Sequence, residues 1–115
     1  MAYRTVLHSK IHRARVTSCD IDYEGSICIA PELMKAADIC EYEKVAVFDV
    51  TNANRFETYA VKGEKGEIKV NGAAARLVKK GDIVIIVTYA IIDENEKENA
   101  KPTIIKVDSS NRIVG

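Results

Sequence analysis

Short segments rich in Val, Ile, Thr and Tyr recur along the whole chain, separated by charged and turn-forming residues. Such segments are typical of β-strands, and 115 residues have room for one domain built from them, spanning 1–115. Asn52–Asn54 is expected to join two of them as a hairpin. The expected strands are Tyr3–Leu7, Ala14–Ile21, Lys44–Thr51, Arg55–Val61, Ile68–Val70, Ile83–Ile92 and Thr103–Val107. This pattern favours a small closed barrel over a layered α/β fold.

Two short helices are expected between the strands. The first opens at Pro31-Glu32 and buries apolar positions within residues 33–39. Asn71 is expected to cap the second, because the alanine-rich run Ala73–Leu77 that follows it has a high helix propensity. Gly81 stands in the position of a helix stop. From its residues alone, the chain is therefore mainly β with short helices.

The charge of the chain is balanced, with 17 basic and 17 acidic residues. Proteins that bind nucleic acid or acidic membranes usually have a basic excess, so neither is expected as a partner. The longest apolar run, Ile83–Val87, is far shorter than the roughly 20 residues that cross a bilayer. The first ten residues contain no apolar segment typical of a secretion signal. A cytoplasmic location is expected.

The three cysteines, Cys19, Cys28 and Cys40, have neither the even number nor the paired spacing of a disulfide framework or a zinc site. They are expected to be small buried residues in a reducing compartment. His8 and His12 lie four residues apart, but no acidic residue stands between them as in a metalloprotease helix. No metal site is expected.

One peptide bond, Gly25-Ser26, has a possible chemistry of its own. A Gly-Ser pair is ordinarily a turn. The serine hydroxyl can nevertheless attack the preceding carbonyl, and glycine tolerates the distorted backbone that this attack requires. The resulting ester can undergo β-elimination to dehydroalanine, which hydrolyses to a pyruvoyl group. The chain would then be cut into residues 1–25 and 26–115.

Six motifs occur together and in order along the chain. They are Lys10-Ile11-His12-Arg13, Tyr23-Glu24-Gly25-Ser26, Val50-Thr51-Asn52 followed by Arg55, Thr58-Tyr59-Ala60, Asn71-Gly72-Ala73-Ala74-Ala75-Arg76 and Gly81-Asp82-Ile83-Val84-Ile85. In this combination the chain resembles the aspartate 1-decarboxylases from about Tyr3 to Val107. The resemblance implies a six-stranded double-psi β-barrel, assembled as a homotetramer with active sites between subunits. It also implies decarboxylation of L-aspartate to β-alanine and CO₂, for the synthesis of pantothenate and coenzyme A.

The resemblance also implies roles for the residues around the Gly25-Ser26 bond. Ser26 would become the pyruvoyl group, which holds the substrate as a Schiff base. Tyr59 would donate the proton that replaces CO₂, a role that suits a phenol. Thr58 would polarise the Gly25 carbonyl during self-cleavage and would contact the substrate.

Further residues would bind the substrate, by the same resemblance. The planar guanidinium of Arg55 would hold a substrate carboxylate through two parallel hydrogen bonds. Lys10 would add a second positive charge for the dianion. Asn71 would position the pyruvoyl group or the substrate, and Gly72, Ala73 and Ala74 would offer backbone amides at a helix start. Each of these residue types also has an ordinary structural role, and only their joint occurrence favours the functional one.

A decarboxylase needs a group that accepts the electrons left behind by CO₂. The chain has no recognisable phosphate cradle for pyridoxal phosphate. The pyruvoyl group derived from Ser26 is therefore the expected cofactor, with no metal and no pyridoxal phosphate. A separate maturation protein is a possible partner, because some relatives need one to cleave.

Two other classes of function stay open. Residues Gly25–Asp49 also resemble the swapped-hairpin (AbrB-like) transcription factors, in which a strand, a proline-led helix and a strand recur. Arg4, Lys10, Arg13 and Arg15 give the first 17 residues a basic character, although the balanced total charge opposes DNA binding. The third possibility is a barrel without activity that serves as an interaction module.

Overall fold

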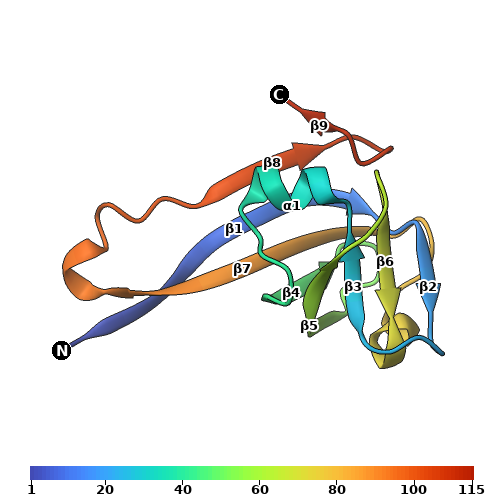
Figure 1. The fold of residues 1–115 in the computed structure, drawn as a ribbon, viewed down its shortest axis with the longest axis horizontal. Coiled ribbons are helices and arrows are strands. Elements are labelled where there is room, and N and C mark those ends of the chain that lie inside the picture. Colours follow the sequence, from blue (N-terminus) through green and yellow to red (C-terminus); the bar gives the residue numbers. More distant parts are fainter.

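Two long strands form the spine of the molecule. In the computed structural model, which describes residues 1–115, β1 (Tyr3–Arg15) pairs antiparallel with β7 (Ile83–Asp93) along its whole length. The pair runs along the longest dimension of the chain (Figure 1). No helix has the length and apolar character that a membrane crossing requires.

The remaining strands complete one mixed sheet of nine strands. They are β2 (Ser18–Asp20), β3 (Ser26–Ile29), β4 (Lys44–Asp49), β5 (Arg55–Lys62), β6 (Ile68–Asn71), β8 (Thr103–Val107) and β9 (Ile113–Val114). Their order in the sheet is β2-β6-β3-β5-β4-β7-β1-β8-β9. The helices are α1 (Pro31–Ala37) and two 3₁₀ helices, η1 (Gly72–Leu77) and η2 (Glu94–Glu96). The mainly β expectation is confirmed.

The sheet curls back on itself. In the strand order, β2 and β1 lie six positions apart, which would separate them by roughly 29 Å in a flat sheet. Only Val16 and Thr17 connect them, and such a link spans about 10 Å at most. The connection is held by hydrogen bonds from Val16 N to Asp82 O (2.9 Å) and from Thr17 N to Ile68 O (2.8 Å). Strong curvature of the sheet is therefore required by the order of its strands.

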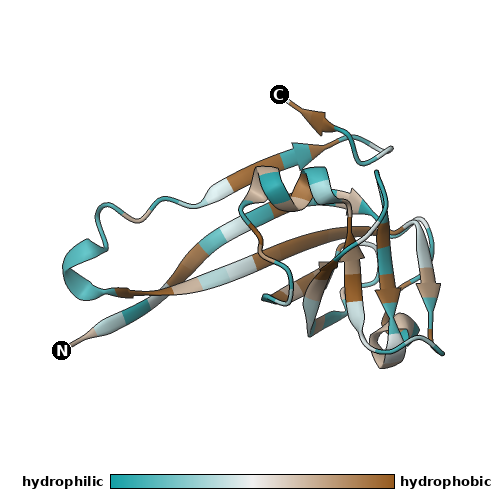
Figure 2. Cartoon of the chain, in the orientation of Figure 1, coloured by the Kyte–Doolittle hydropathy of each residue, from teal (hydrophilic) through white to brown (hydrophobic).

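A cluster of 20 buried apolar residues fills the space enclosed by the strands and by α1. Figure 2 shows hydrophobic residues along β3, in alternation along β6, and in the half of β7 that pairs with β4. Fully buried members such as Ile27, Ile68 and Ile86 each stabilise the fold by about 1.5–3 kcal/mol. Because all four residues of β3 are buried, this strand is firmly fixed between β5 and β6.

The expected break between Tyr3–Leu7 and Ala14–Ile21 is wrong. Residues 3–15 form the continuous strand β1, and only the short β2 follows it. β1 pairs with β7 on one side and with β8 on the other, so its charged middle is held by hydrogen bonds despite its composition. Irregularities between Leu7 and Ser9 and between Ile11 and Ala14 absorb the mismatch, and Arg13 takes a positive φ of 65° there.

The second helix also differs from expectation. It is a 3₁₀ helix that begins at Gly72, and the Asn71 side chain does not cap it. Asn71 instead directs its Nδ2 at residues of β3, and its Oδ1 accepts no hydrogen bond from the helix. The helix ends at Leu77, so Gly81, with a φ of 92°, lies in the following turn and is not a helix stop. Tertiary contacts have overridden local propensity here.

The cysteines are all free, but they differ in burial. Cys28 is buried and Cys19 is half-buried, whereas Cys40 is exposed at the end of the segment after α1. The expectation of three buried thiols is therefore wrong for Cys40. The reason is that the chain turns outward after Ile39, which is the last buried residue of this segment.

Candidate active site

The Gly25-Ser26 bond lies where the chain enters β3, and Ser26 has an unusual backbone there. Its φ is 113°, a region that residues with a side chain rarely adopt. Such a conformation costs on the order of 1–3 kcal/mol. Ser26 is also 2% exposed and pairs with Asn71 of β6 in the sheet register. The buried strand that follows it thus holds a strained residue in place.

The Asn71 side chain is the polar partner of Ser26. Its Nδ2 donates to Ser26 Oγ over 3.1 Å, and the same nitrogen lies 3.4 Å from Cys28 Sγ. Asn71 is 1% exposed, and its Oδ1 is buried without any hydrogen-bond partner. The serine hydroxyl therefore faces an amide group in a site shielded from water.

Two further residues contact Gly25. The Tyr59 hydroxyl donates to the Gly25 carbonyl oxygen over 3.3 Å, which is long for this type of bond. From another side Gly72, with a φ of 70°, packs so closely that a Cβ there would lie 3.0 Å from Gly25 Cα. Only glycine combines that φ with that approach. The end of β6 is in this way pressed against the bond before Ser26.

A cavity of about 310 Å³ opens beside this bond. Its lining residues are Tyr23, Glu24, Gly25, Ser26, Cys28, Glu41, Tyr42, Tyr59, Val61 and Lys62. Its charged side chains are two carboxylates and one ammonium group. With Lys62 as its single cation against two carboxylates, this lining offers no net attraction to a ligand with two carboxylates, such as aspartate.

Other residues expected at the site lie elsewhere in the chain. Arg55 precedes Tyr59 by four residues on β5, which is roughly 13 Å along a strand. Its guanidinium stacks on the Phe48 ring, 4.7 Å from the centroid, beside a second cavity of about 350 Å³. Lys10 lies half-buried in the middle of β1, between Val87 of β7 and Ile104 of β8.

Thr58, which is expected to polarise the Gly25 carbonyl, does not contact that carbonyl in the single chain. Side chains alternate along β5, so half-buried Thr58 faces the opposite side of the strand from Tyr59. The hydrogen bond to the Gly25 carbonyl comes from Tyr59. Of the expected helix-start residues, Gly72 touches Gly25, while Ala73 is exposed and Ala74 is half-buried behind it.

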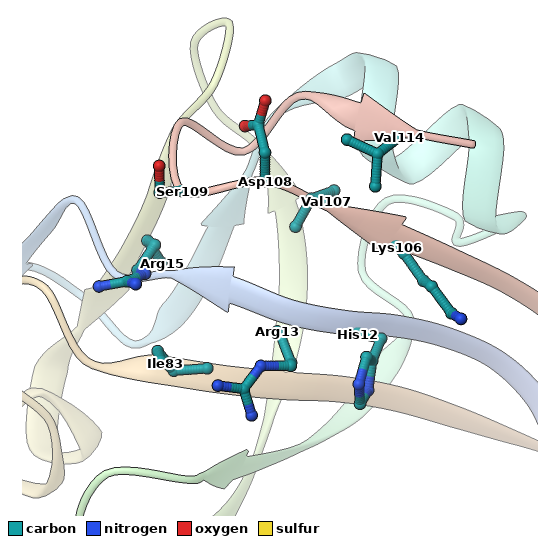
Figure 3. Close-up of a pocket in the computed structure, with 9 residues that line it drawn as sticks. All are labelled: His12, Arg13, Arg15, Ile83, Lys106, Val107, Asp108, Ser109 and Val114. Carbon is teal, nitrogen blue, oxygen red and sulfur yellow. The ribbon is translucent and has the colours of Figure 1, made fainter.

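A basic pocket of about 310 Å³ lies where β1 and β8 run side by side (Figure 3). His12 pairs with Lys106 in the register of these strands, and Arg13 and Arg15 line the same pocket. Burial, and next the charges of Lys10, Arg13 and Lys106, lower the pKa of His12. Figure 3 shows the cationic groups spread apart, not directed to a common point. The pocket contains none of the residues around Ser26.

Cys28 is the residue of this site that the sequence reasoning missed. The sequence pattern predicts for it only a buried position in the core. A signal was present, because residues two apart on a strand share one face, and Cys28 follows Ser26 by two. Its contact with Asn71, 43 residues away in the chain, was not visible in the sequence.

Comparisons with known proteins agree with one another. A family model described as "Aspartate decarboxylase" matches residues 2–114. "Aspartate 1-decarboxylase" of Legionella pneumophila (strain Lens) is 56% identical over 115 residues, which cover 98% of this chain and 86% of that protein. The proteins of the same name from Myxococcus xanthus (strain DK1622) and Syntrophus aciditrophicus (strain SB) are each 54% identical. Their matches cover 96% of this chain, and 87% and 97% of their own lengths respectively.

Proposed function

Because the chain belongs to the aspartate decarboxylase family, we propose that it works through a pyruvoyl group made from its own Ser26. The activity is that of aspartate 1-decarboxylase, a carboxy-lyase that converts L-aspartate to β-alanine and CO₂. The β-alanine serves pantothenate synthesis. The swapped-hairpin DNA-binding alternative is set aside, because the family match extends over nearly the whole chain.

The backbone of Ser26 is the observation that supports this proposal most strongly. A buried serine held at a φ of 113° stores strain at its junction with Gly25, and breaking that junction releases the strain. The surrounding groups fit the chemistry, since Asn71 reaches Oγ and the Tyr59 hydroxyl lies beside the bond at which the pyruvoyl group would form. A serine kept only for packing needs none of these features.

The proposed self-cleavage has three balanced steps. Ser26 Oγ attacks the Gly25 carbonyl carbon, and the acyl group moves from the nitrogen to Oγ, which leaves a free amine. Loss of the Ser26 Cα proton then expels Oγ from Cβ as part of the Gly25 carboxylate, and dehydroalanine remains. Finally, one water hydrolyses the dehydroalanine, whose α-nitrogen leaves as ammonia. The products are chain 1–25 and chain 26–115, and the second begins with the pyruvoyl group.

Neighbouring side chains would assist these steps. Thr58 is proposed to polarise the Gly25 carbonyl, supported by its place beside Tyr59 in the motif Thr58-Tyr59. Because Thr58 and Tyr59 face opposite sides of β5, Thr58 would reach this carbonyl only after the strand or the loop before Ser26 shifts.

In turnover, the pyruvoyl group would supply a ketone for condensation with the substrate amine, with loss of water, and the neighbouring amide carbonyl would take up the electrons released as CO₂ departs. Tyr59 would then protonate the substrate Cα, because its hydroxyl already lies beside the bond at which the pyruvoyl group forms. Asn71 and the backbone amides of Gly72, Ala73 and Ala74 would orient the bound substrate from the β6 side. The packing of Gly72 against Gly25 supports this assignment.

The cations for the substrate dianion would come from a neighbouring copy of the chain. The cavity beside Ser26 lacks them, whereas Arg55 and Lys10 lie on other parts of the sheet. A homotetramer with active sites between subunits would bring both kinds of residue together. We further propose that the curled sheet is the double-psi barrel of this family and that the enzyme is cytoplasmic, with a maturation protein as a possible partner.

Intact mass measurement under denaturing conditions tests the proposal. We expect fragments 1–25 and 26–115, whose summed mass exceeds that of the uncut chain by one water minus one ammonia. Simple hydrolysis would add one water and remove nothing. The Ser26→Ala variant should stay whole, fold, and lack decarboxylase activity. A preparation that decarboxylates aspartate while every chain keeps its serine would contradict the proposal.

A further inference from the structure

Cys28 shares the amide group of Asn71 with Ser26. All three side chains are nearly closed to solvent, with Cys28 9% exposed, so no water competes for the amide hydrogens. Nδ2 donates to Ser26 Oγ, with 3.1 Å between the nitrogen and the oxygen, and also to Cys28 Sγ, with 3.4 Å between the nitrogen and the sulfur. A thiol sulfur is a weak acceptor.

No hydrogen bond besides these two restrains the Asn71 carboxamide. Its Oδ1 has no hydrogen-bond partner, and the terminal torsion of asparagine is soft and nearly twofold. Without the sulfur contact, the group could turn so that Oδ1, and not Nδ2, faces Ser26. Cys28 itself is held firmly, because Gly63 lies so close that a Cβ there would be 3.0 Å from Cys28 Cβ.

The orientation of this amide matters for one step of the self-cleavage proposed above, on which this inference rests. When the bond between Cβ and Oγ of Ser26 breaks, Oγ leaves as a carboxylate oxygen and gains negative charge. An N–H group directed at Oγ stabilises that charge, whereas a carbonyl oxygen in its place would repel it. The correct face of Asn71 is therefore needed in the elimination step.

We propose that Cys28 is a positioning residue for self-cleavage, which keeps Nδ2 of Asn71 directed at Ser26 Oγ. It touches neither the scissile bond nor the substrate through this contact, and it acts through Asn71 alone. Its effect is expected on elimination of the ester and not on the preceding acyl shift.

The test compares two variants of nearly equal volume, Cys28→Ala and Cys28→Ser, as freshly purified uncut chains. Cys28→Ala loses the acceptor, and its first-order rate of cleavage should fall by about three- to tenfold, the usual effect of one hydrogen bond. An ester sensitive to hydroxylamine should accumulate in it. Cys28→Ser keeps an acceptor and should restore most of the rate. Exposed Cys40 supplies the control Cys40→Ala, which should cleave like the wild type.

Several outcomes would overturn the inference. Cleavage of Cys28→Ala at the wild-type rate would remove the role altogether. Equal slowing in the Ala and Ser variants, with equal losses in melting temperature, would show a packing effect in its place. If Cys28→Ala cleaved more slowly but accumulated no ester, the slowed step would be the acyl shift and not the elimination. If the wild-type chain never cleaves, both the proposed function and this inference fail. If the wild-type chain cleaves and Cys28→Ala cleaves at the same rate, only this inference fails.

Discussion

Ser26 is reactive in this proposal because of where it lies and not because of an ionised partner. No histidine or carboxylate accepts a hydrogen bond from its hydroxyl, and its one side-chain partner is the neutral amide of Asn71. The driving force resides in the backbone, whose positive φ is imposed by a fully buried strand. At the residue scale, then, strain and a shielded donor replace the base that an ordinary serine nucleophile requires.

Substitution of Tyr59 separates self-cleavage from turnover. Its 3.3 Å bond to the Gly25 carbonyl is long, so Tyr59→Phe is expected to cleave normally. Turnover should fall by about 10²–10⁴-fold, because the proton donor is lost. Cleavage is measured by intact mass, and kcat is normalised to the pyruvoyl content.

Thr58→Val is the matched comparison and is expected to remain uncut. If Tyr59→Phe were uncut and Thr58→Val were cleaved, the tyrosine hydroxyl would be the group that polarises the Gly25 carbonyl, and the assignment of Thr58 would be wrong. Full activity of Tyr59→Phe would contradict its role as proton donor.

At the scale of elements, the hairpin of β4 and β5 is anchored by a buried pair of carboxyl groups. Asp49 accepts hydrogen bonds from the backbone N–H groups of Thr51 (2.8 Å) and Asn52 (3.1 Å). Asp82, before β7, accepts from Lys79 N over 3.0 Å. Burial, and next a hydrogen bond shared with Asp82, raise the pKa of Asp49 to about 6. The neutral form of Asp49 is therefore favoured where the turn before Arg55 meets the start of β7.

This pair predicts a pH-dependent stability. The folded chain keeps the Asp49 proton up to about pH 6, whereas an ordinary aspartate loses it near 3.8. The contribution is therefore fully present below about pH 4 and is lost as the pH rises through 6. Asp49→Asn cannot ionise, keeps an acceptor for the turn, and should be more stable than wild type at pH 7.5 by up to about 3 kcal/mol. The two should converge below pH 4.

Urea unfolding at pH 4 and pH 7.5, at one protein concentration, measures this difference. Asp108 supplies a control of opposite sign, because backbone N–H groups of Arg112 and Ser110 lower its pKa. Asp108→Asn should therefore lose stability at pH 7.5 relative to wild type. An Asp49→Asn chain that is less stable than wild type at pH 7.5 would show that the two carboxyl groups do not oppose ionisation.

At the scale of the whole molecule, two features of the single chain indicate that it associates with other copies. Its cavity beside Ser26 lacks the cations for a dianion. It also exposes large apolar side chains on β1, β7, β8 and β9, namely Tyr3, Tyr89, Ile91, Ile104 and Ile113. Exposed apolar surface of this kind marks sites of association. Both features are explained if neighbouring copies cover these strands and supply Arg55 and Lys10.

Complementation between two inactive variants tests this arrangement. Chains with Ser26→Ala and chains with Arg55→Ala should each be inactive as pure assemblies. When they are co-expressed in equal amounts, about a quarter of the sites should combine an intact Ser26 with an intact Arg55 from another copy, if association is random. Each variant has its own affinity tag, and decarboxylase activity is measured on assemblies purified through both tags. Light scattering gives the number of copies in each assembly. Inactive mixed assemblies would mean that both residues act within one chain.

The local parts of the fold could be predicted from the sequence. The hairpin of β4 and β5 and the helix α1 are confirmed, because a turn and a proline-led helix depend on residues close in the chain. The break expected within β1 was wrong, since β7 and β8 support its charged middle from both sides. The cap expected of Asn71 was wrong for a similar reason, because residues of β3 compete for its side chain.

The sequence by itself determined the mainly β class and, through the order of its motifs, the family. Strand patterns and motifs depend on residues close together in the chain, so they can be recognised without the tertiary structure. Only the tertiary structure decided which residues meet at the Gly25-Ser26 bond, because Tyr59 and Asn71 reach it from 34 and 45 residues away. It also decided that Arg55 lies apart from that bond. Contacts across such distances depend on the order of strands in the sheet, which the side-chain periodicity of each strand does not encode.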